Sequence, residues 1–80
     1  MKLANLIEDA FTSGLDRVGL AWWVEINTSQ PICTYYFGPF MSSKEAELAR
    51  SGYIEDLEQE AAQGITVRIQ QCKPERLTIC

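Results

Sequence analysis

The segment between residues 34 and 64 constrains the fold of this 80-residue chain more than any other part of it. It begins with the aromatic string TYYFGPF, which predicts a strand that a Gly-Pro step ends. Apolar residues then recur every three or four positions, as on one face of an amphipathic helix. Ser42 and Glu45 have the spacing of a capping box, and Gly64 is the expected left-handed terminator, so the helix is predicted over residues 43–63.

The rest of the chain adds a second helix and three more strands to that frame. Apolar periodicity predicts a helix within residues 3–18, and bulky or alternating apolar residues predict strands. The predicted strands are residues 20–26, 32–37, 65–70 and 77–79.

These elements predict a single α+β domain over residues 1–80, with the order α-β-β-α-β-β. An N-terminal helix within residues 1–19 precedes a ββαββ core over residues 20–80. We expect a four-stranded, mostly antiparallel sheet that is packed by the 43–63 helix and by the N-terminal helix.

Charge and hydropathy exclude several classes of partner. The formal net charge is −4, and the seven Lys and Arg residues are scattered, whereas nucleic-acid binding depends on clustered basic side chains. No apolar run approaches the ~20 residues of a membrane helix, so no membrane insertion is expected. The first residues lack the apolar core of a secretory signal, which favours a cytoplasmic protein.

The sequence offers few candidates for catalytic or metal-binding chemistry. It contains no histidine and no Cys-x-x-Cys pair, which excludes Cys/His zinc sites, histidine general bases and Ser-His-Asp triads. It also lacks a Gly-rich phosphate loop ending in Lys-Ser/Thr. We therefore expect no catalytic residue, no metal and no cofactor.

Large aromatic residues crowd the predicted hairpin. Because neighbours in a strand point to opposite faces, Trp22 and Trp23 are expected on opposite faces, as are Tyr35 and Tyr36. If both helices cover one face, the other face presents a tryptophan and a tyrosine to solvent, as anchors for a protein partner. If each helix covers one face, the same rings brace a thin core. The sequence leaves both arrangements open.

Four acidic residues near the end of the long predicted helix form a second candidate surface. They are Glu55, Asp56, Glu58 and Glu60. The helix macrodipole disfavours negative charge at this end by ~0.3–1 kcal/mol per group, so the cluster points to a basic partner. An ordinary solvated helix face is the structural alternative.

The three cysteines, an odd number without a secretory signal, argue against a disulfide framework. Cys33 lies within a predicted strand and is expected to be an inert buried thiol. Cys72 lies at the last predicted turn and Cys80 follows the last predicted strand, and across that hairpin they would form the reversible disulfide of a redox-responsive protein. Ordinary thiols are the alternative, because Lys73 is the one basic neighbour that would lower a thiol pKa.

Several short strings between residues 23 and 60 resemble a known family. WVEI, P-x-CTYYFGPF and GYIEDLEQE, together spanning much of residues 20–80, look like small cyanobacterial proteins that are catalogued as a domain of unknown function. The resemblance implies a cyanobacterial host, a cytoplasmic setting and a connection to photosynthetic or stress physiology. It implies no catalytic residues.

Together these observations predict a non-catalytic interaction or regulatory module that binds a protein partner or a second copy of itself. The four hairpin aromatics are the expected primary surface, and the acidic residues at 55–60 are the secondary one. A redox-responsive protein is one alternative. A small ligand carrier or enzyme is another, and it would require an enclosed pocket with convergent polar groups.

Overall fold

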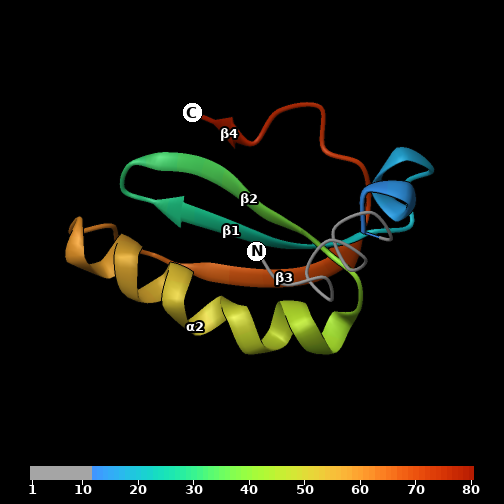
Figure 1. Ribbon diagram of the computed structural model, residues 1–80. Coiled ribbons are helices and arrows are strands. Elements are labelled where there is room, and N and C mark those ends of the chain that lie inside the picture. Colours follow the sequence, from blue (N-terminus) through green and yellow to red (C-terminus); the bar gives the residue numbers. More distant parts are fainter. Residues whose placement is uncertain (1–11) are drawn as a thin grey trace, which may run out of the picture.

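The computed structural model of the protein describes residues 12–80, in which four strands form one sheet and a long helix covers one of its faces (Figure 1). The elements are β1 (Trp22–Ser29), β2 (Ile32–Phe40), α2 (Ser43–Gln59), β3 (Thr66–Gln71) and β4 (Thr78–Ile79). The strand order is β3-β1-β2-β4, and every neighbouring pair is antiparallel. This arrangement confirms the predicted α+β fold.

The N-terminal helix is described over residues 12–17, and the remainder of its predicted range lies outside the described residues. It runs through Gly14 and ends in a turn at Gly19. There the amide of Leu20 donates to the carbonyl of Leu15 at 2.8 Å and that of Gly19 donates to Asp16 at 3.1 Å, the two bonds of a Schellman motif.

The β1–β2 hairpin is longer and tighter than the sequence predicts. β1 continues to Ser29, which pairs directly with Ile32, so the turn contains only Gln30 and Pro31. The hydroxyl of Thr28 donates to the carbonyl of Pro31 and helps to close this turn. The five residues left between the predicted strands 20–26 and 32–37 are therefore too many for the turn, because residues 27–29 pair in the ladder.

The Gly38-Pro39 step does not end β2, contrary to the prediction. Trp22 pairs with Phe40 and Val24 pairs with Phe37, so β2 contains one more residue than β1 between these pairs. A bulge of this kind leaves a residue outside the ladder, and a proline without an N–H is tolerated there. The peptide bonds before Pro31 and Pro39 are both cis.

Helix α2 begins as predicted. The amide of Glu45 donates to the Ser42 hydroxyl at 3.2 Å, and the Glu45 carboxylate accepts from the amide of Met41 at 3.0 Å. The predicted capping box is thus formed in both directions. The bond to the Glu45 carboxylate comes from Met41, the residue before the N-cap, instead of from the N-cap itself.

The end of α2 differs from the prediction. The helix stops at Gln59 instead of reaching residue 63, and Ala61 adopts a positive φ of 65°. The Ala62 amide donates to Leu57 and the Ala61 amide to Glu58, again the two bonds of a Schellman motif. An alanine therefore occupies the position where glycine was expected, and Gly64 lies beyond the helix against Ser29.

The core lies between α2 and the sheet. Val24 and Ile26 from β1 are fully buried and pack with Ala46 and Leu57 from α2. Around them lie half-buried apolar side chains from α2, from β1, β2 and β3, and from the connection between α2 and β3. These are Trp22, Tyr35, Phe37, Phe40, Tyr53, Ile54, Ala62, Ile65, Val67 and Ile69. One face of the sheet is thus used for the core, and the alternating residues of the same strands lie on the other face.

Candidate functional site

The four hairpin aromatics divide between the faces as predicted, but they do not form an exposed patch. Trp22 and Tyr35 lie on the core side, where both are half-buried. Trp23 and Tyr36 lie on the second face, which we define as the sheet face opposite α2. Trp23 is only 4% exposed, and Tyr36 is half-buried. Of the two arrangements that the sequence leaves open, the one that exposes a tryptophan is therefore wrong for Trp23.

The burial of Trp23 has a local cause. A Cβ at Gly38 would lie 2.9 Å from the indole ring, so the β2 backbone at the bulge passes directly over the ring. This close approach requires a glycine and covers part of the ring. The indole Nε1 is buried and has no hydrogen-bond partner.

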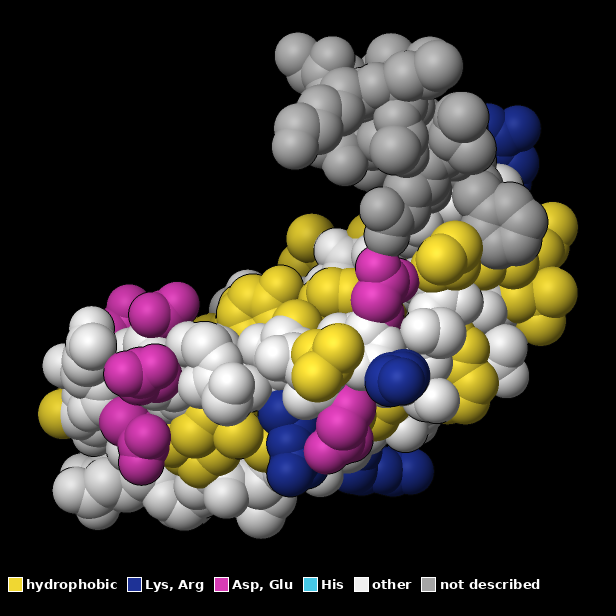
Figure 2. All heavy atoms as spheres, turned by 60° about the horizontal axis from the view of Figure 1, so that its bottom comes forward, with side chains coloured by type: hydrophobic (Ala, Val, Ile, Leu, Met, Phe, Trp, Pro, Cys, Tyr) yellow, Lys and Arg dark blue, Asp and Glu magenta, His cyan; other side chains and the backbone are white. Residues whose placement is uncertain are grey.

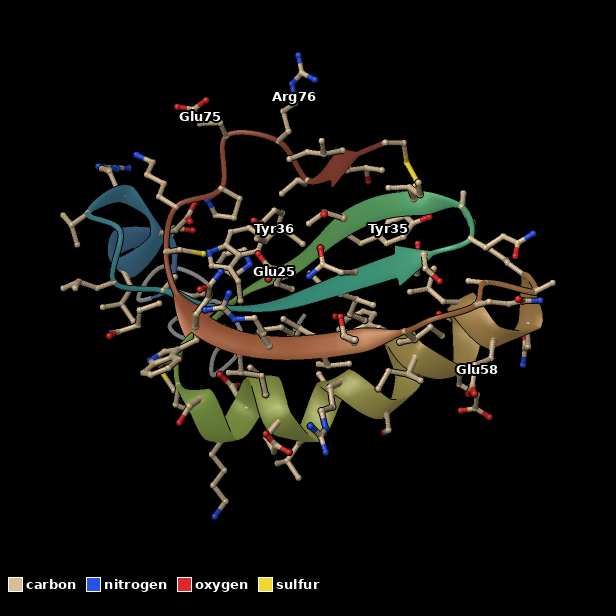
Figure 3. All side chains as sticks on the ribbon, turned by 180° about the vertical axis from the view of Figure 1, so that it is seen from behind. Glu25, Tyr35, Tyr36, Glu58, Glu75 and Arg76 are labelled. Atoms are coloured by element: carbon tan, nitrogen blue, oxygen red, sulfur yellow. A yellow bond between two sulfur atoms is a disulfide. The ribbon has the colours of Figure 1, made fainter. Side chains whose placement is uncertain are left out.

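A buried carboxylate occupies the centre of the second face. Glu25 is 8% exposed and accepts hydrogen bonds from the Tyr36 hydroxyl at 2.8 Å, from Asn27 Nδ2 at 3.2 Å and from Gln70 Nε2 at 3.3 Å. Figure 3 shows Glu25 and Tyr36 next to each other on the sheet. The network extends to β2, because the Thr34 hydroxyl donates to Asn27 Oδ1 at 2.6 Å. It joins β1, β2 and β3 through polar side chains.

The network changes the ionisation of its neighbours. The hydrogen bond to Glu25, followed by burial and by the negative charge of Glu25, raises the pKa of the Tyr36 phenol. Burial, followed by the charges of Glu25 and Asp16, raises the pKa of the Cys72 thiol. Cys72 therefore remains a protonated thiol over a wider pH range than usual, which makes it a poor nucleophile.

Sequence reasoning did not identify Glu25 as a candidate residue. The available signal was its position in the string WWVEI, where a charged residue interrupts bulky apolar residues in a predicted strand. A charge in such a strand is almost never fully buried without partners, so it points to a polar network on the other face of the sheet.

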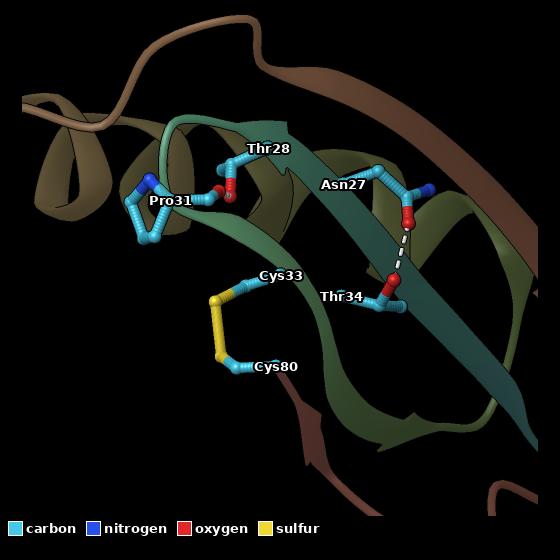
Figure 4. The surroundings of a disulfide bond; sticks show 6 residues. All are labelled: Asn27, Thr28, Pro31, Cys33, Thr34 and Cys80. Carbon is cyan, nitrogen blue, oxygen red and sulfur yellow. Dashed lines mark hydrogen bonds between the residues drawn. A yellow bond between two sulfur atoms is a disulfide. The ribbon is translucent and has the colours of Figure 1, made fainter.

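The cysteine pairing differs from the prediction. Cys80 forms a disulfide with Cys33, and Cys72 is the free cysteine (Figure 4). The reason is topological: β4 pairs with β2, so β3 and β4 lie at opposite edges of the sheet and form no hairpin. Cys80 follows Ile79, whose partner is Thr34, and it therefore lies opposite Cys33 with a Cα–Cα distance of 4.2 Å. The expected inert thiol at Cys33 was also wrong.

Exposed apolar side chains gather beside this disulfide. Ile32 is 83% exposed, Leu77 55% and Ile79 43%. Ile79 pairs with Thr34, which follows Ile32 by two residues on β2. The carbonyl of Leu77 accepts a hydrogen bond from the Tyr36 amide at 2.8 Å. These three residues, from here called the edge patch, therefore lie on adjacent segments at the β2–β4 edge.

A shallow groove adjoins the edge patch, with a volume of about 230 Å³. Its lining comes from both sides of the β2–β4 edge and from the end of β1. The lining residues are Asn27, Thr28, Ile32, Cys33, Thr34, Ile79 and Cys80. The groove is small beside the roughly 300–1,000 Å³ of typical small-molecule sites.

The acidic cluster lies at the C-terminal end of α2, as predicted from the sequence, with Glu60 as the C-cap residue. Glu55, Asp56, Glu58 and Glu60 are all exposed, and acidic side chains gather at this end of the molecule in Figure 2. The last turn of α2 contains no basic residue. Among residues 12–80 the one ion pair joins Arg50 to Glu47, one turn earlier on the same helix. The cluster is thus not neutralised by basic side chains of the described chain.

The described residues contain no candidate metal site and no candidate membrane-spanning helix. Within the described range, no three His, Cys, Asp or Glu side chains are grouped as a metal ion would require. Neither helix of residues 12–80 combines the length and the apolar character needed to cross a bilayer.

These features define a small α+β domain in which a helix covers one sheet face, a buried carboxylate network lies on the other, and a disulfide holds the edge strand. The chain belongs to the family described as a domain of unknown function (DUF1816), whose model matches residues 15–79. No curated protein and no solved structure matches the chain.

Proposed function

We propose that this protein is a non-catalytic interaction module that binds a protein partner through the edge patch. The observation that carries the proposal is the exposure of three large apolar side chains on adjacent segments, Ile32, Leu77 and Ile79. Contiguous apolar surface of this kind is typical of interfaces, whereas single exposed apolar residues are normal. The edge patch replaces the hairpin aromatics as the primary surface, because Trp23 is buried.

A secondary contact is proposed at the acidic cluster on α2. Its four carboxylates lack basic neighbours, and the helix macrodipole adds negative potential at the same end. A partner with basic side chains would relieve both effects. Such rim charges mainly accelerate association and depend on salt.

The proposed setting is the cytoplasm of a cyanobacterium, with a connection to photosynthetic or stress physiology. Support comes from the strings CTYYFGPF and GYIEDLEQE, on which the resemblance to cyanobacterial proteins depends.

Affinity capture tests the proposed surface. The wild-type chain would be used as bait in a cyanobacterial lysate and compared with Ile32→Asp, which places a charge in the edge patch without disturbing the core. Leu48→Asp is the matched control, because Leu48 is 73% exposed and lies on α2. We expect partner recovery to fall for Ile32→Asp and to be unchanged for Leu48→Asp. Equal recovery by all three folded proteins would contradict the proposal.

A further inference from the structure

Strand β4 is a short cover on the edge of β2. It has two residues, which pair with Thr34 and Tyr35, and the preceding Leu77 contributes one further backbone bond to β2. Every residue from 75 to 80 is exposed, so burial contributes little to holding this segment. The Cys33–Cys80 disulfide is therefore the main attachment of the segment to the sheet (Figure 4).

The strand beneath this cover lacks the usual protection of an edge. β2 spans nine residues, ICTYYFGPF, and carries no charged side chain. Its bulge and Pro39 protect only the end nearest α2. The opposite edge of the sheet, β3, is shorter and carries Arg68. An uncovered, uncharged strand presents a row of unpaired N–H and C=O groups to other chains, which natural proteins avoid with charges or covers.

We propose that reduction of the Cys33–Cys80 disulfide releases residues 75–80 and that the uncovered β2 edges of two copies then pair antiparallel, forming a symmetric dimer. The reductant is a protein dithiol. One of its thiolates attacks Sγ of Cys80 and expels the Cys33 thiolate, which takes up a proton. Its second thiol resolves the mixed disulfide, so that the S–S bond of this protein gains two electrons and two protons while the dithiol becomes a disulfide.

The structure favours this direction of attack. Cys80 is exposed, whereas Cys33 is buried in β2. The free thiol of Cys72 does not compete, because it lies by the opposite edge strand, β3, and its pKa is raised. Disulfides of cytoplasmic proteins are usually transient and redox-sensing, which agrees with a bond that opens on reduction.

A second copy fits the uncovered edge for two reasons. Antiparallel pairing of identical strands is isologous, so each copy offers the same surface to the other and the assembly closes at two. The segment contains no like charges that would oppose each other across the new ladder. The inference rests on the proposed interaction function only in its use of the same edge of the sheet.

Sedimentation of the full chain in its oxidised and reduced forms tests the inference. We expect a monomer of 9.0 kDa when the disulfide is intact and a doubled mass after treatment with dithiothreitol. Cys80→Ser should form the dimer without reductant, and Cys72→Ser should behave as the wild type. A reduced protein that remains monomeric, or an oxidised protein that is already dimeric, would overturn the inference.

Two further variants identify the surface. On the Cys80→Ser background, Ile32→Lys places a charge at the start of β2 and should return the protein to a monomer. Leu48→Lys on the same background should leave the dimer intact, and dissociation by this change instead would overturn edge pairing. The lysate experiment separates this inference from the proposed function. If the oxidised chain captures a partner but the reduced form remains monomeric, only the redox dimer is contradicted. If the redox dimer forms but no partner is captured, only the proposed binding of a partner is contradicted.

Discussion

Replacement of Cys80 by serine tests the contribution of the disulfide to stability. The bond closes a loop with a sequence separation of 47 residues. In the chain-entropy relation, a loop of this length removes about 14 cal/mol/K from the unfolded chain, which corresponds to about 4 kcal/mol at 25 °C. A domain of this size has a total unfolding free energy of only about 4–12 kcal/mol. The bond is therefore expected to supply a large fraction of the stability.

The figure of about 4 kcal/mol is an upper limit for this protein. Residues 75–80 are exposed, and without the bond they gain freedom in the folded state as well as in the unfolded state. That gain offsets part of the loss, so we expect Cys80→Ser to lower the unfolding free energy by about 2–4 kcal/mol. The folded body formed by α2, β1, β2 and β3 should remain, because its core contains none of the released residues.

Urea titration followed by tryptophan fluorescence provides the measurement, at a protein concentration low enough to avoid association. The m value should rise, because the unfolded chain without a cross-link exposes more surface. Cys72→Ser is the control and should retain most of the stability. A loss in Cys72→Ser equal to that in Cys80→Ser would refute the assigned pairing, and no loss in Cys80→Ser would refute the stabilising role.

Three further predictions follow from local geometry. Ala61→Gly should raise the unfolding free energy by about 1 kcal/mol in a thermal or urea assay, because it relieves the positive φ at the end of α2; no gain would contradict the assigned cap. Gly38→Ala should lower the unfolding free energy by about 1–3 kcal/mol, because a Cβ would overlap the Trp23 ring. Near-ultraviolet circular dichroism should report the shifted indole, and an unchanged spectrum and stability would contradict the close approach. The raised pKa of Tyr36 means that its hydrogen bond to Glu25 stabilises the fold fully below pH ~10 and is lost as pH rises through the folded-state pKa. Tyr36→Phe should therefore flatten the fall in urea midpoint above that pH, and an unchanged slope would contradict the assignment.

The sequence predicts local structure where the signal is contained in neighbouring residues. The start of α2 follows from Ser42 and Glu45, and the opposite orientation of Trp22 and Trp23 follows from strand alternation alone. The end of α2 was missed because tertiary packing overrides the preference for glycine. Leu57 and Ala62 both pack on the core, and this contact holds Ala61 between them in the left-handed region.

The remaining errors concern contacts between distant residues. The disulfide was assigned wrongly because β4 was assumed to pair with its neighbour in sequence, β3, whereas it crosses to β2. No local pattern distinguishes these two partners for a strand of two residues. The sequence left open whether Trp23 is exposed, because the bulge that carries Gly38 over its ring depends on the register between β1 and β2.

The buried carboxylate explains how β4 can be released while the rest of the sheet is kept. Glu25 accepts hydrogen bonds from Tyr36 on β2 and from Gln70 on β3, so one residue of β1 fixes its position against both neighbours. A slip of one residue would move the carboxylate into the core beside α2, where it would lose these donors at a cost of several kcal/mol. The register of β3, β1 and β2 is thus set without any contribution from β4. Because the network includes no residue of segment 75–80, opening the disulfide uncovers the β2 edge on a sheet that keeps its alignment, which is the condition that edge-to-edge pairing of two copies requires.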